Sequence, residues 1–150
     1  QGEELCKLYE QIYGLDVTIC RFYNVYGDYM PTEGSYRTVL PIFLEQYRNN
    51  ETFTITGDGK QRRDFTHVDD IIDAMMKVVQ LNKWGNVYEL GRGKNYSIKQ
   101  VVDMFPDPAW TYIDMIPGEA RDTLCRSELA RKKLKWKPKV NLEDWIKEQL

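Results

Sequence analysis

The chain has 150 residues, of which 42% are hydrophobic and 29% are charged, and its formal net charge is −2. This length can bury the core of one domain, or of part of a larger domain, and the apolar runs are too short to cross a membrane. Because the net charge is weak and negative, we expect neither nucleic acid nor an anionic membrane as a partner, and any anion-binding site must be local.

Helical and strand patterns alternate along the sequence, which is typical of an α/β protein. The predicted elements are, in chain order, a helix over 5–12, a buried strand over 17–27, a surface loop over 28–38, a helix over 40–47, strands over 52–56 and 64–68 around an Asp-Gly turn, a helix over 71–79, a strand over 87–90, a helix over 98–105, a strand over 110–116, and two last helices that Ser127 and Asn141 open.

Several of the predicted helices carry end signals. Gly14 is placed to end the first helix in the left-handed conformation. Asp69 or Asp70 would cap the helix over 71–79. Ser97 and Gln100 have the spacing of a capping box, so the next helix should begin directly after Ser97.

Potential metal ligands are few and scattered. Cys6, Cys20 and Cys125 are odd in number and widely spaced, which argues against both disulfides and a metal site and favours a reducing, cytoplasmic location. The single histidine, His67, stands between a short strand and a helix, where we expect a packed, hydrogen-bonded side chain rather than a catalyst. The sequence begins at Gln1 without a signal or transit segment and reads as if cut into a helix.

The densest polar cluster lies at 54–70, between two apolar segments. Gly57 and Gly59 would let the backbone approach a ligand closely, and Lys60, Arg62 and Arg63 follow at once. Because guanidinium groups bind phosphate oxygens bidentately, we interpret this cluster as a clamp for a small phosphorylated ligand. The alternative is a solvated hairpin tip, which has the same composition.

Five segments, taken together and in order, resemble a known protein family. They are RFYNVYG (21–27), PTEGSYRTVLPIF (31–43), ITGDGKQRRDFTHVDDIIDA (55–74), PGEARDT (117–123) and LARKKLKWKPKVNLEDWI (129–146). In this order they resemble the C-terminal half of the NAD-dependent nucleotide-sugar epimerase/dehydratase family, whose members are extended short-chain dehydrogenases/reductases. The resemblance runs along the whole chain and implies a substrate-binding lobe with the last strands and helices of a Rossmann-type NAD-binding sheet.

The resemblance also implies how the chain is divided. Residues 1–27 would belong to the dinucleotide-binding domain and 28–150 mainly to the substrate lobe, with 86–105 returning to the dinucleotide sheet. The family's catalytic Tyr-x-x-x-Lys pair and its glycine-rich turn lie upstream of the matching region, and GRGKN at 91–95 comes too late to be that turn. No catalytic residue is therefore expected in this chain, and NAD should bind the complete enzyme rather than this chain alone.

Substrate contacts are carried over from the family position by position. Asn24 matches an asparagine that hydrogen-bonds the substrate near its diphosphate, and Arg63 matches the arginine that holds the diphosphate. Arg62 should face solvent, because neighbours along a strand point to opposite faces. Glu119 matches an acidic residue that binds the ribose hydroxyls, and Arg121 is a second candidate phosphate ligand.

Two further pairs of residues are implied to approach the ligands. Val39 and Leu40 match a segment whose backbone approaches the substrate phosphates. Phe22 and Tyr23 fall where family members approach the nicotinamide of NAD.

The sequence departs from the family pattern at two positions. Thr56 stands where several relatives carry an aromatic residue that stacks on the nucleobase, so this stacking contact with the base would be absent. Ile116 stands where relatives often have an arginine, and the lost phosphate contact would matter unless Arg121 replaces it.

The implied reaction begins when a tyrosinate removes a proton from a sugar hydroxyl while the carbon gives a hydride to NAD. The short loop at 31–43 is most similar to that of 4-epimerases acting on UDP-hexoses or UDP-N-acetylhexosamines, and the resemblance implies a homodimer or other self-association. A nucleotide-sugar 4,6-dehydratase is the alternative reaction. A non-catalytic sugar-nucleotide-binding or interaction module, working with a separate dinucleotide-binding chain, is the alternative function. A nucleic-acid binder using KQRR is disfavoured by the few basic residues.

Overall fold

The computed structural model describes residues 1–34, 37–115 and 117–150, so Ile116 and part of the loop over 28–38 lie outside the described residues. Helices and strands alternate along the chain, and the protein is an α/β protein. The helices are α1 (Gly2–Tyr13), α2 (Val39–Arg48), α3 (Val68–Leu81), α4 (Ile98–Val102), α5 (Leu129–Lys133) and α6 (Leu142–Gln149). The strands are β1 (Ile19–Phe22), β2 (Val25–Tyr26), β3 (Phe53–Thr56), β4 (Arg62–Asp64), β5 (Thr66–His67), β6 (Val87–Leu90), β7 (Asn95–Ser97) and β8 (Trp110–Ile113).

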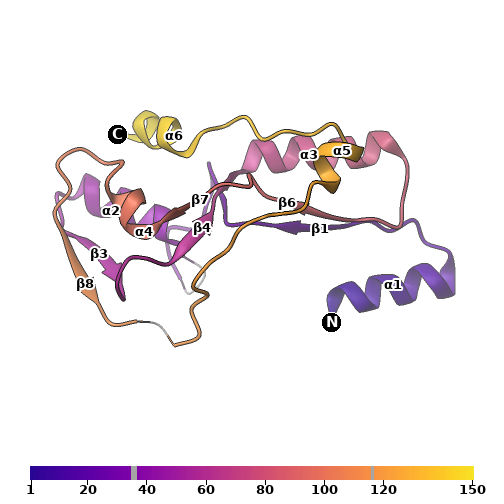
Figure 1. Ribbon diagram of the computed structural model, residues 1–150, viewed down its shortest axis with the longest axis horizontal. Coiled ribbons are helices and arrows are strands. Elements are labelled where there is room, and N and C mark those ends of the chain that lie inside the picture. Colours follow the sequence, from indigo (N-terminus) through magenta and orange to yellow (C-terminus); the bar gives the residue numbers. More distant parts are fainter. Residues whose placement is uncertain (35–36, 116) are drawn as a thin grey trace.

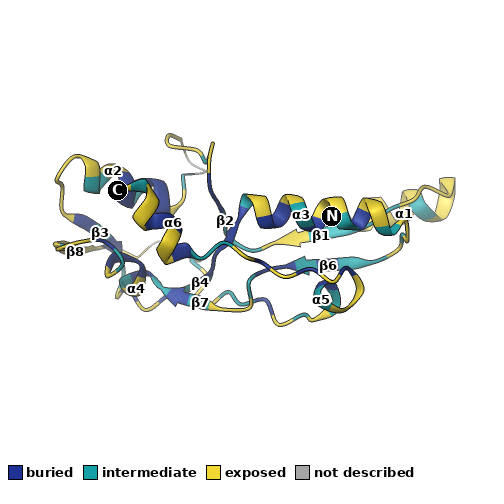
Figure 2. Ribbon diagram, turned by 90° about the horizontal axis from the view of Figure 1, so that it is seen from above, coloured by how far each residue is buried: buried dark blue, intermediate teal, exposed yellow. Residues whose placement is uncertain are grey.

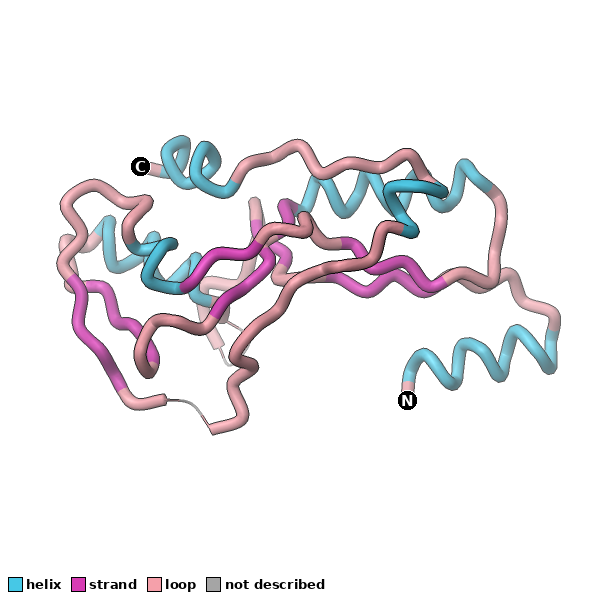
Figure 3. The backbone as a smooth tube through the Cα atoms, viewed as in Figure 1, coloured by secondary structure: helices cyan, strands magenta, loops and turns pink. Residues whose placement is uncertain are grey.

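The described strands form pairs rather than one continuous sheet. β1–β6, β2–β5 and β3–β8 are parallel, and β4–β7 is antiparallel. β3 and β4 each pair with a different partner, so the hairpin expected around the Asp-Gly turn does not form. Segment 121–123 lies beside β4, because Arg62 N donates to Arg121 O over 2.9 Å and Thr123 N donates to Arg62 O over 3.0 Å. Figure 3 shows the irregular segment over 117–128, which passes β4 and leads to α5.

The predicted strand over 17–27 is interrupted in the middle. Asn24 adopts a positive φ of 30°, a conformation that asparagine tolerates better than most residues. The break ends β1 and starts β2 as a separate strand with its own partner. It also places the Asn24 side chain at the junction of the two pairs.

The molecule is elongated (Figure 1), and its described buried residues form two hydrophobic cores. One core lies where α2, α4 and α6 surround β3, and Phe43, Ile55 and Ile146 are fully buried in it. The other lies between α3, α5 and β6, and Ala74 and Tyr88 are fully buried there. Tyr26 of β2 and Tyr96 of β7 belong to the first core, and the candidate site lies beside β2 and β4.

The structure confirms some of the predicted end signals and contradicts others. Asn141 caps α6 as predicted, whereas α5 begins after Glu128 rather than at Ser127. Gly14 ends α1 with φ 64°, and Ser97 and Gln100 form the complete capping box at α4. The expected aspartate cap of α3 is wrong, because His67 is the cap and its Nδ1 accepts a hydrogen bond from Asp69 N over 3.2 Å. His67 is buried against the rings of Tyr26 and Trp145, as expected for a packed histidine.

Helix α1 stands apart from both cores. None of its residues is buried, and Leu5, Leu8 and Ile12 are 56%, 46% and 60% exposed. Figure 2 shows the exposed colour along this helix. Its main described tie to the rest is an ion pair between Glu3 and Arg21 of β1. None of the helices in the described ranges is long and apolar enough to cross a membrane.

Candidate functional site

A cavity of about 260 Å³ lies between α2, β3, β4 and the start of α4. Its lining residues are Asn24, Val25, Thr38, Val39, Leu40, Thr54, Thr56, Gln61, Arg63, Phe65, Ile98 and Glu119. The cavity thus brings together six of the seven substrate residues expected from the sequence, from segments that lie far apart in the chain. Arg121 is the one that it does not include. Among the described residues no cluster of three or more metal-ligating side chains occurs.

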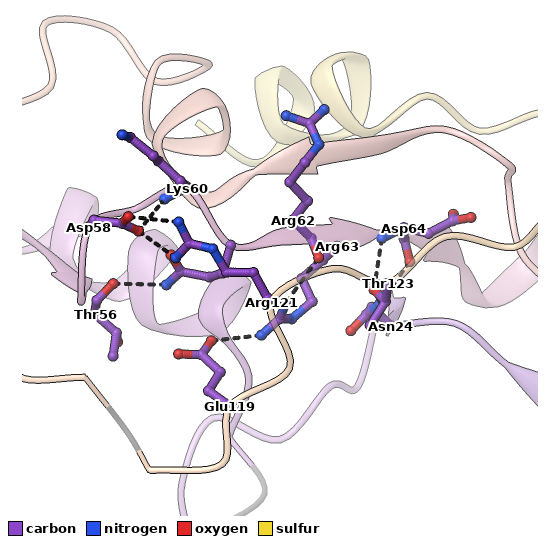
Figure 4. Close-up of polar contacts among 11 residues, drawn as sticks. Asn24, Thr56, Asp58, Lys60, Arg62, Arg63, Asp64, Glu119, Arg121 and Thr123 are labelled. Atoms are coloured by element: carbon purple, nitrogen blue, oxygen red, sulfur yellow. Dashed lines mark hydrogen bonds and ion pairs between the residues drawn. The ribbon is translucent and has the colours of Figure 1, made fainter.

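Arg63 and Glu119 contact each other directly. Nη2 of Arg63 donates to Oε1 of Glu119 over 2.7 Å, and Nη1 donates to the carbonyl oxygen of Arg62 over 2.9 Å (Figure 4). The side chains are 13% and 24% exposed, so this ion pair is partly shielded from water. The expected phosphate ligand and the expected ribose ligand therefore neutralise each other in the structure.

Asn24 is held in one orientation by the fold. Its Nδ2 donates to the carbonyl oxygen of Asp64 over 3.0 Å and to Oγ1 of Thr123 over 2.9 Å (Figure 4). A flipped amide would set Oδ1 against the Asp64 carbonyl, which cannot donate. Both amide hydrogens are thus used, and the atom that Asn24 can offer to a ligand is Oδ1, an acceptor suited to a hydroxyl or N–H group rather than to a phosphate oxygen.

The N-terminus of α2 forms another part of the cavity wall. Thr38 precedes the helix and makes no side-chain cap bond, while Val39 and Leu40 are its first residues. The first N–H groups of a helix have no partner within the helix and favour negative charge. Pro41 has no N–H, so the backbone donors of this first turn come from Val39 and Leu40. Leu40 as a whole residue is 1% exposed, and its side chain belongs to the core.

Gln61 is a cavity residue that the sequence analysis did not single out. It is 5% exposed, and its Nε2 donates to the carbonyl oxygen of Thr56 over 2.8 Å. Its Oε1 is buried and has no hydrogen-bond partner among the described residues. A buried unpaired acceptor is unfavourable and often marks a functional position. No local spacing pattern distinguishes this glutamine from an exposed turn residue, so only the three-dimensional structure reveals it.

Arg121 lies beside the cavity rather than in its wall. Its Nη1 and Nη2 donate to the two carboxylate oxygens of Asp58, each over 2.7 Å, and both side chains are about half exposed. Arg121 and the Lys60 backbone N–H hold the pKa of Asp58 well below its usual value. Together with Gln61 and Glu119, Arg121 borders a small adjoining hollow of about 30 Å³.

Arg62 does not point freely into solvent as expected. Its Nε donates to Asn95 Oδ1 over 2.8 Å, its Nη2 to Asn95 O over 2.9 Å, and its Nη1 to Gln100 Oε1 over 3.2 Å. The side chain thus ties β4 to β7 and to the capping box of α4. Arg62 does not line the cavity that Arg63 lines, which agrees with alternation along the strand. The strand pattern could not show, however, that Arg62 binds residues distant in sequence instead of facing solvent.

Phe22 and Tyr23 line neither the cavity nor the adjoining hollow. Phe22 is 50% exposed at the carboxyl end of β1, the side of a parallel strand pair where ligands commonly bind. The Tyr23 hydroxyl donates to Glu89 Oε2 over 3.3 Å. Burial and the nearby Glu89 carboxylate raise the pKa of Tyr23, so its hydroxyl is a poor base at neutral pH.

Comparisons with known proteins agree with this architecture. Residues 1–91 match the model of the NAD-dependent epimerase/dehydratase family. A protein of Methanocaldococcus jannaschii with the provisional name UDP-glucose 4-epimerase is 33% identical over an alignment of 150 positions that covers 97% of this chain and 48% of that protein.

Two solved structures share the fold. The UDP-glucuronic acid 4-epimerase of Bacillus cereus, solved with UDP-glucuronic acid and NAD, has a TM-score of 0.89 at 26% identity, over 99% of this chain and 48% of that one. The UDP-glucose 4-epimerase of Thermotoga maritima, solved with UDP-glucose, has a TM-score of 0.88 at 29% identity, over 95% of this chain and 47% of that one.

The chain spans about half the length of the relatives that it matches and covers part of their Rossmann-type fold. Both the sequence match and the structural match extend over nearly all of its residues. The chain belongs to the NAD-dependent epimerase/dehydratase family, and its relatives include UDP-sugar 4-epimerases.

Proposed function

We propose that the complete protein in which this chain occurs is an NAD-dependent 4-epimerase of a UDP-hexose or UDP-N-acetylhexosamine, and that this chain supplies most of the nucleotide-sugar site. The observation that carries the proposal is the cavity in which Asn24, Arg63 and Glu119 meet from three separate segments. These three side chains offer an acceptor, a cation and a carboxylate, which complement the hydroxyl groups and the diphosphate of a nucleotide sugar.

Binding would exchange the internal partners of the site for ligand groups. The diphosphate takes the place of Glu119 on the Arg63 guanidinium and also accepts from the N–H groups at the start of α2. The freed Glu119 carboxylate accepts hydrogen bonds from the two ribose hydroxyls. Asn24 Oδ1 accepts from a hydroxyl of the sugar. Arg121, now paired with Asp58, would add a second cation only if that exposed pair opened.

The dinucleotide part of the proposal rests on the β1–β6 pair. We assign residues 1–27 and 86–105 to the dinucleotide-binding domain and the remainder of 28–150 mainly to the substrate lobe. The parallel pairing of β1 with β6 supports the assignment of these two strands, whereas β7 pairs with β4 and α4 packs with α2 and β3 in the other core. The exposed Phe22 ring at the end of β1 would pack beside the nicotinamide of NAD, which supplies a hydride acceptor when bound. This chain's own contribution to the reaction is to hold and orient the nucleotide sugar.

A direct assay tests the proposal. The purified complete protein is incubated with NAD and, separately, with UDP-glucose, UDP-N-acetylglucosamine and UDP-glucuronic acid, and the sugars are separated by chromatography. We expect one of them to convert to its 4-epimer. Loss of water to a 4-keto-6-deoxy sugar would instead identify a dehydratase. Tight UDP binding without any conversion would favour the non-catalytic binding module.

A further inference from the structure

Asp64 is the most heavily hydrogen-bonded buried acid beside the candidate site. Its side chain is completely buried. Its Oδ1 accepts from Arg92 N over 2.9 Å, and its Oδ2 accepts from Gly93 N over 2.9 Å and from Cys125 N over 3.0 Å. Burial raises the pKa of Asp64, and the three backbone N–H bonds oppose that rise. In this way one carboxylate joins β4 to the β6–β7 turn and to the segment after 121–123.

The backbone of Asp64 contacts the site residues as well. Its carbonyl oxygen accepts from Asn24 Nδ2, and its N–H donates to Thr123 Oγ1 over 3.3 Å. Thr123 Oγ1 also accepts from Asn24, so the three residues form a closed triangle of hydrogen bonds (Figure 4). Arg63 precedes Asp64 directly, and Glu119 lies on the chain segment that Cys125 anchors.

The packing around the carboxylate leaves no room for a looser arrangement. A Cβ on Gly91 would lie 2.3 Å from Cys125 Cβ and 3.0 Å from Asp64 Oδ2. With a side chain at position 91, Cys125 and Asp64 would have to move away from that residue, so a glycine is needed there. A buried charge without a counter-ion is costly, and here three N–H donors from two separate segments compensate for it. These hydrogen bonds fix the positions of the two segments relative to each other.

We propose that Asp64 is a positioning residue of the nucleotide-sugar site: it fixes Asn24, Arg63 and the segment bearing Glu119 relative to one another and thereby sets the affinity for the nucleoside diphosphate. This inference rests on the proposed function, since it concerns the same cavity. Asp64 itself touches no ligand in this scheme and acts only through its neighbours.

The test compares Asp64→Asn with Asp70→Asn in the complete protein. Asp70 is the matched control, because it is also a buried aspartate and accepts from the Lys139 and Val140 backbone N–H groups. Neither aspartate lines the cavity, but Asn24, which is bonded to Asp64, does, whereas the partners of Asp70 do not. We expect both variants to lower the thermal midpoint. Asp64→Asn should weaken UDP binding about tenfold in calorimetry and leave NAD affinity within about twofold. Asp70→Asn should change neither affinity. Equal losses of UDP affinity in the two variants would overturn the proposal.

A double-mutant cycle separates positioning from general destabilisation. If Asp64 acts through the segment bearing Glu119, the loss caused by Asp64→Asn should shrink when Glu119→Gln is already present. An unchanged loss in that background contradicts the proposal. Thr123→Val provides a second route if Asp64→Asn does not fold, because it removes only the hydroxyl that links Asp64 N to Asn24. Because Asn24 Nδ2 and Asp64 N then lose this acceptor, the variant should lower the thermal midpoint as well as weaken UDP binding, and unaltered UDP binding would contradict the proposal.

Hydrogen exchange measured without ligand tests the role of Asp64 separately from the proposed function. If the unmodified protein binds neither UDP nor a UDP-sugar, the proposed function fails. Hydrogen exchange then still tests Asp64: its asparagine variant should speed exchange over 119–125, whereas Asp70→Asn should speed it over 136–140. Unchanged exchange over 119–125 in Asp64→Asn would show that Asp64 does not hold this segment.

Discussion

At the residue scale, the site consists of groups that already satisfy one another. Arg63 binds Glu119, Arg121 binds Asp58, and both amide hydrogens of Asn24 are taken by the protein. A ligand must therefore offer better partners than these internal ones. A diphosphate can do so for a guanidinium, because its oxygens carry more charge than a single carboxylate and bind bidentately.

The first prediction concerns Arg63 and its neighbour. Arg63→Ala in the complete protein removes charge-assisted hydrogen bonds of about 1.5–3 kcal/mol and should weaken UDP binding about ten- to a hundredfold. The loss should lie toward the upper end, since Glu119 is then left as an unpaired negative charge near the phosphates. Isothermal titration with UDP measures this effect.

Arg62→Ala is the matched control for Arg63→Ala. It removes the bonds to Asn95 and Gln100, so the free energy of unfolding should fall by about 1–2 kcal/mol while UDP affinity stays nearly constant. Equal losses of affinity in the two variants would indicate a diffuse electrostatic patch instead of a phosphate clamp.

The second prediction follows from the fixed orientation of Asn24. Asn24→Asp places an oxygen where Nδ2 now donates to the Asp64 carbonyl, and should lower the free energy of unfolding by about 1–3 kcal/mol. Asn82→Asp is the control, because Asn82 also has a positive φ, of 49°, at the end of α3. Its cost should be much smaller in urea denaturation. Similar costs for both would mean that the backbone conformation, not the hydrogen bond, is the sensitive feature.

At the element scale, helix α4 illustrates how a local signal serves the site. Its capping box orders the start of the helix, and Ile98, the first helical residue, lines the cavity. Gln100 has a second task, since its Oε1 also accepts from Arg62. The cap thus couples the beginning of α4 to β4, the strand that carries Arg63.

The third prediction tests this cap. Ser97→Ala should lower the free energy of unfolding by about 1 kcal/mol, because the Gln100 N–H loses its partner. Ser127→Ala serves as the control, since Ser127 Oγ accepts only a long bond of 3.4 Å from Leu129 N near the start of α5. Urea denaturation of both variants should show the larger loss for Ser97→Ala, and the reverse order would contradict the assigned capping role.

The sequence predicted helices well because their signals are local. The apolar stripe of α1, its Gly14 end and the Ser97–Gln100 box all lie within a few residues. Strand partners could not be predicted in this way, because β3 pairs with β8 more than fifty positions away instead of with neighbouring β4. The same limit applies to the site: Arg63 and Glu119 were each singled out, but nothing local showed that they meet, and Gln61 gave no signal.

At the scale of the whole molecule, the chain contains the cavity that we propose as the substrate site but not the groups expected to perform the chemistry. Its sequence contains no Tyr-x-x-x-Lys pair. Our fourth prediction is therefore that the 150-residue chain alone converts no UDP-hexose, with or without NAD, because a hydride acceptor and base that are not held beside the sugar cannot react with it. The same chromatographic assay measures this. NAD-dependent conversion by the isolated chain would refute our placing of the catalytic residues outside it.

The fifth prediction concerns the apolar surface that α1 leaves uncovered. Leu5, Leu8 and Ile12 form a stripe on a helix with no buried residue, and exposed apolar stripes of this kind drive association. We expect the isolated chain to form dimers or larger species at micromolar concentration in analytical ultracentrifugation. Replacing Leu8 and Ile12 together with glutamate should shift it toward monomer.

Gln11→Glu is the control for this prediction. It adds a negative charge to the same helix and removes no apolar side chain, so it should leave the association state nearly unchanged. If the unmodified chain sediments as a single monomeric species and unfolds in one sharp transition, the stripe does not act as a contact surface. If Gln11→Glu dissociates the chain as fully as the double replacement does, charge repulsion rather than apolar burial controls the association.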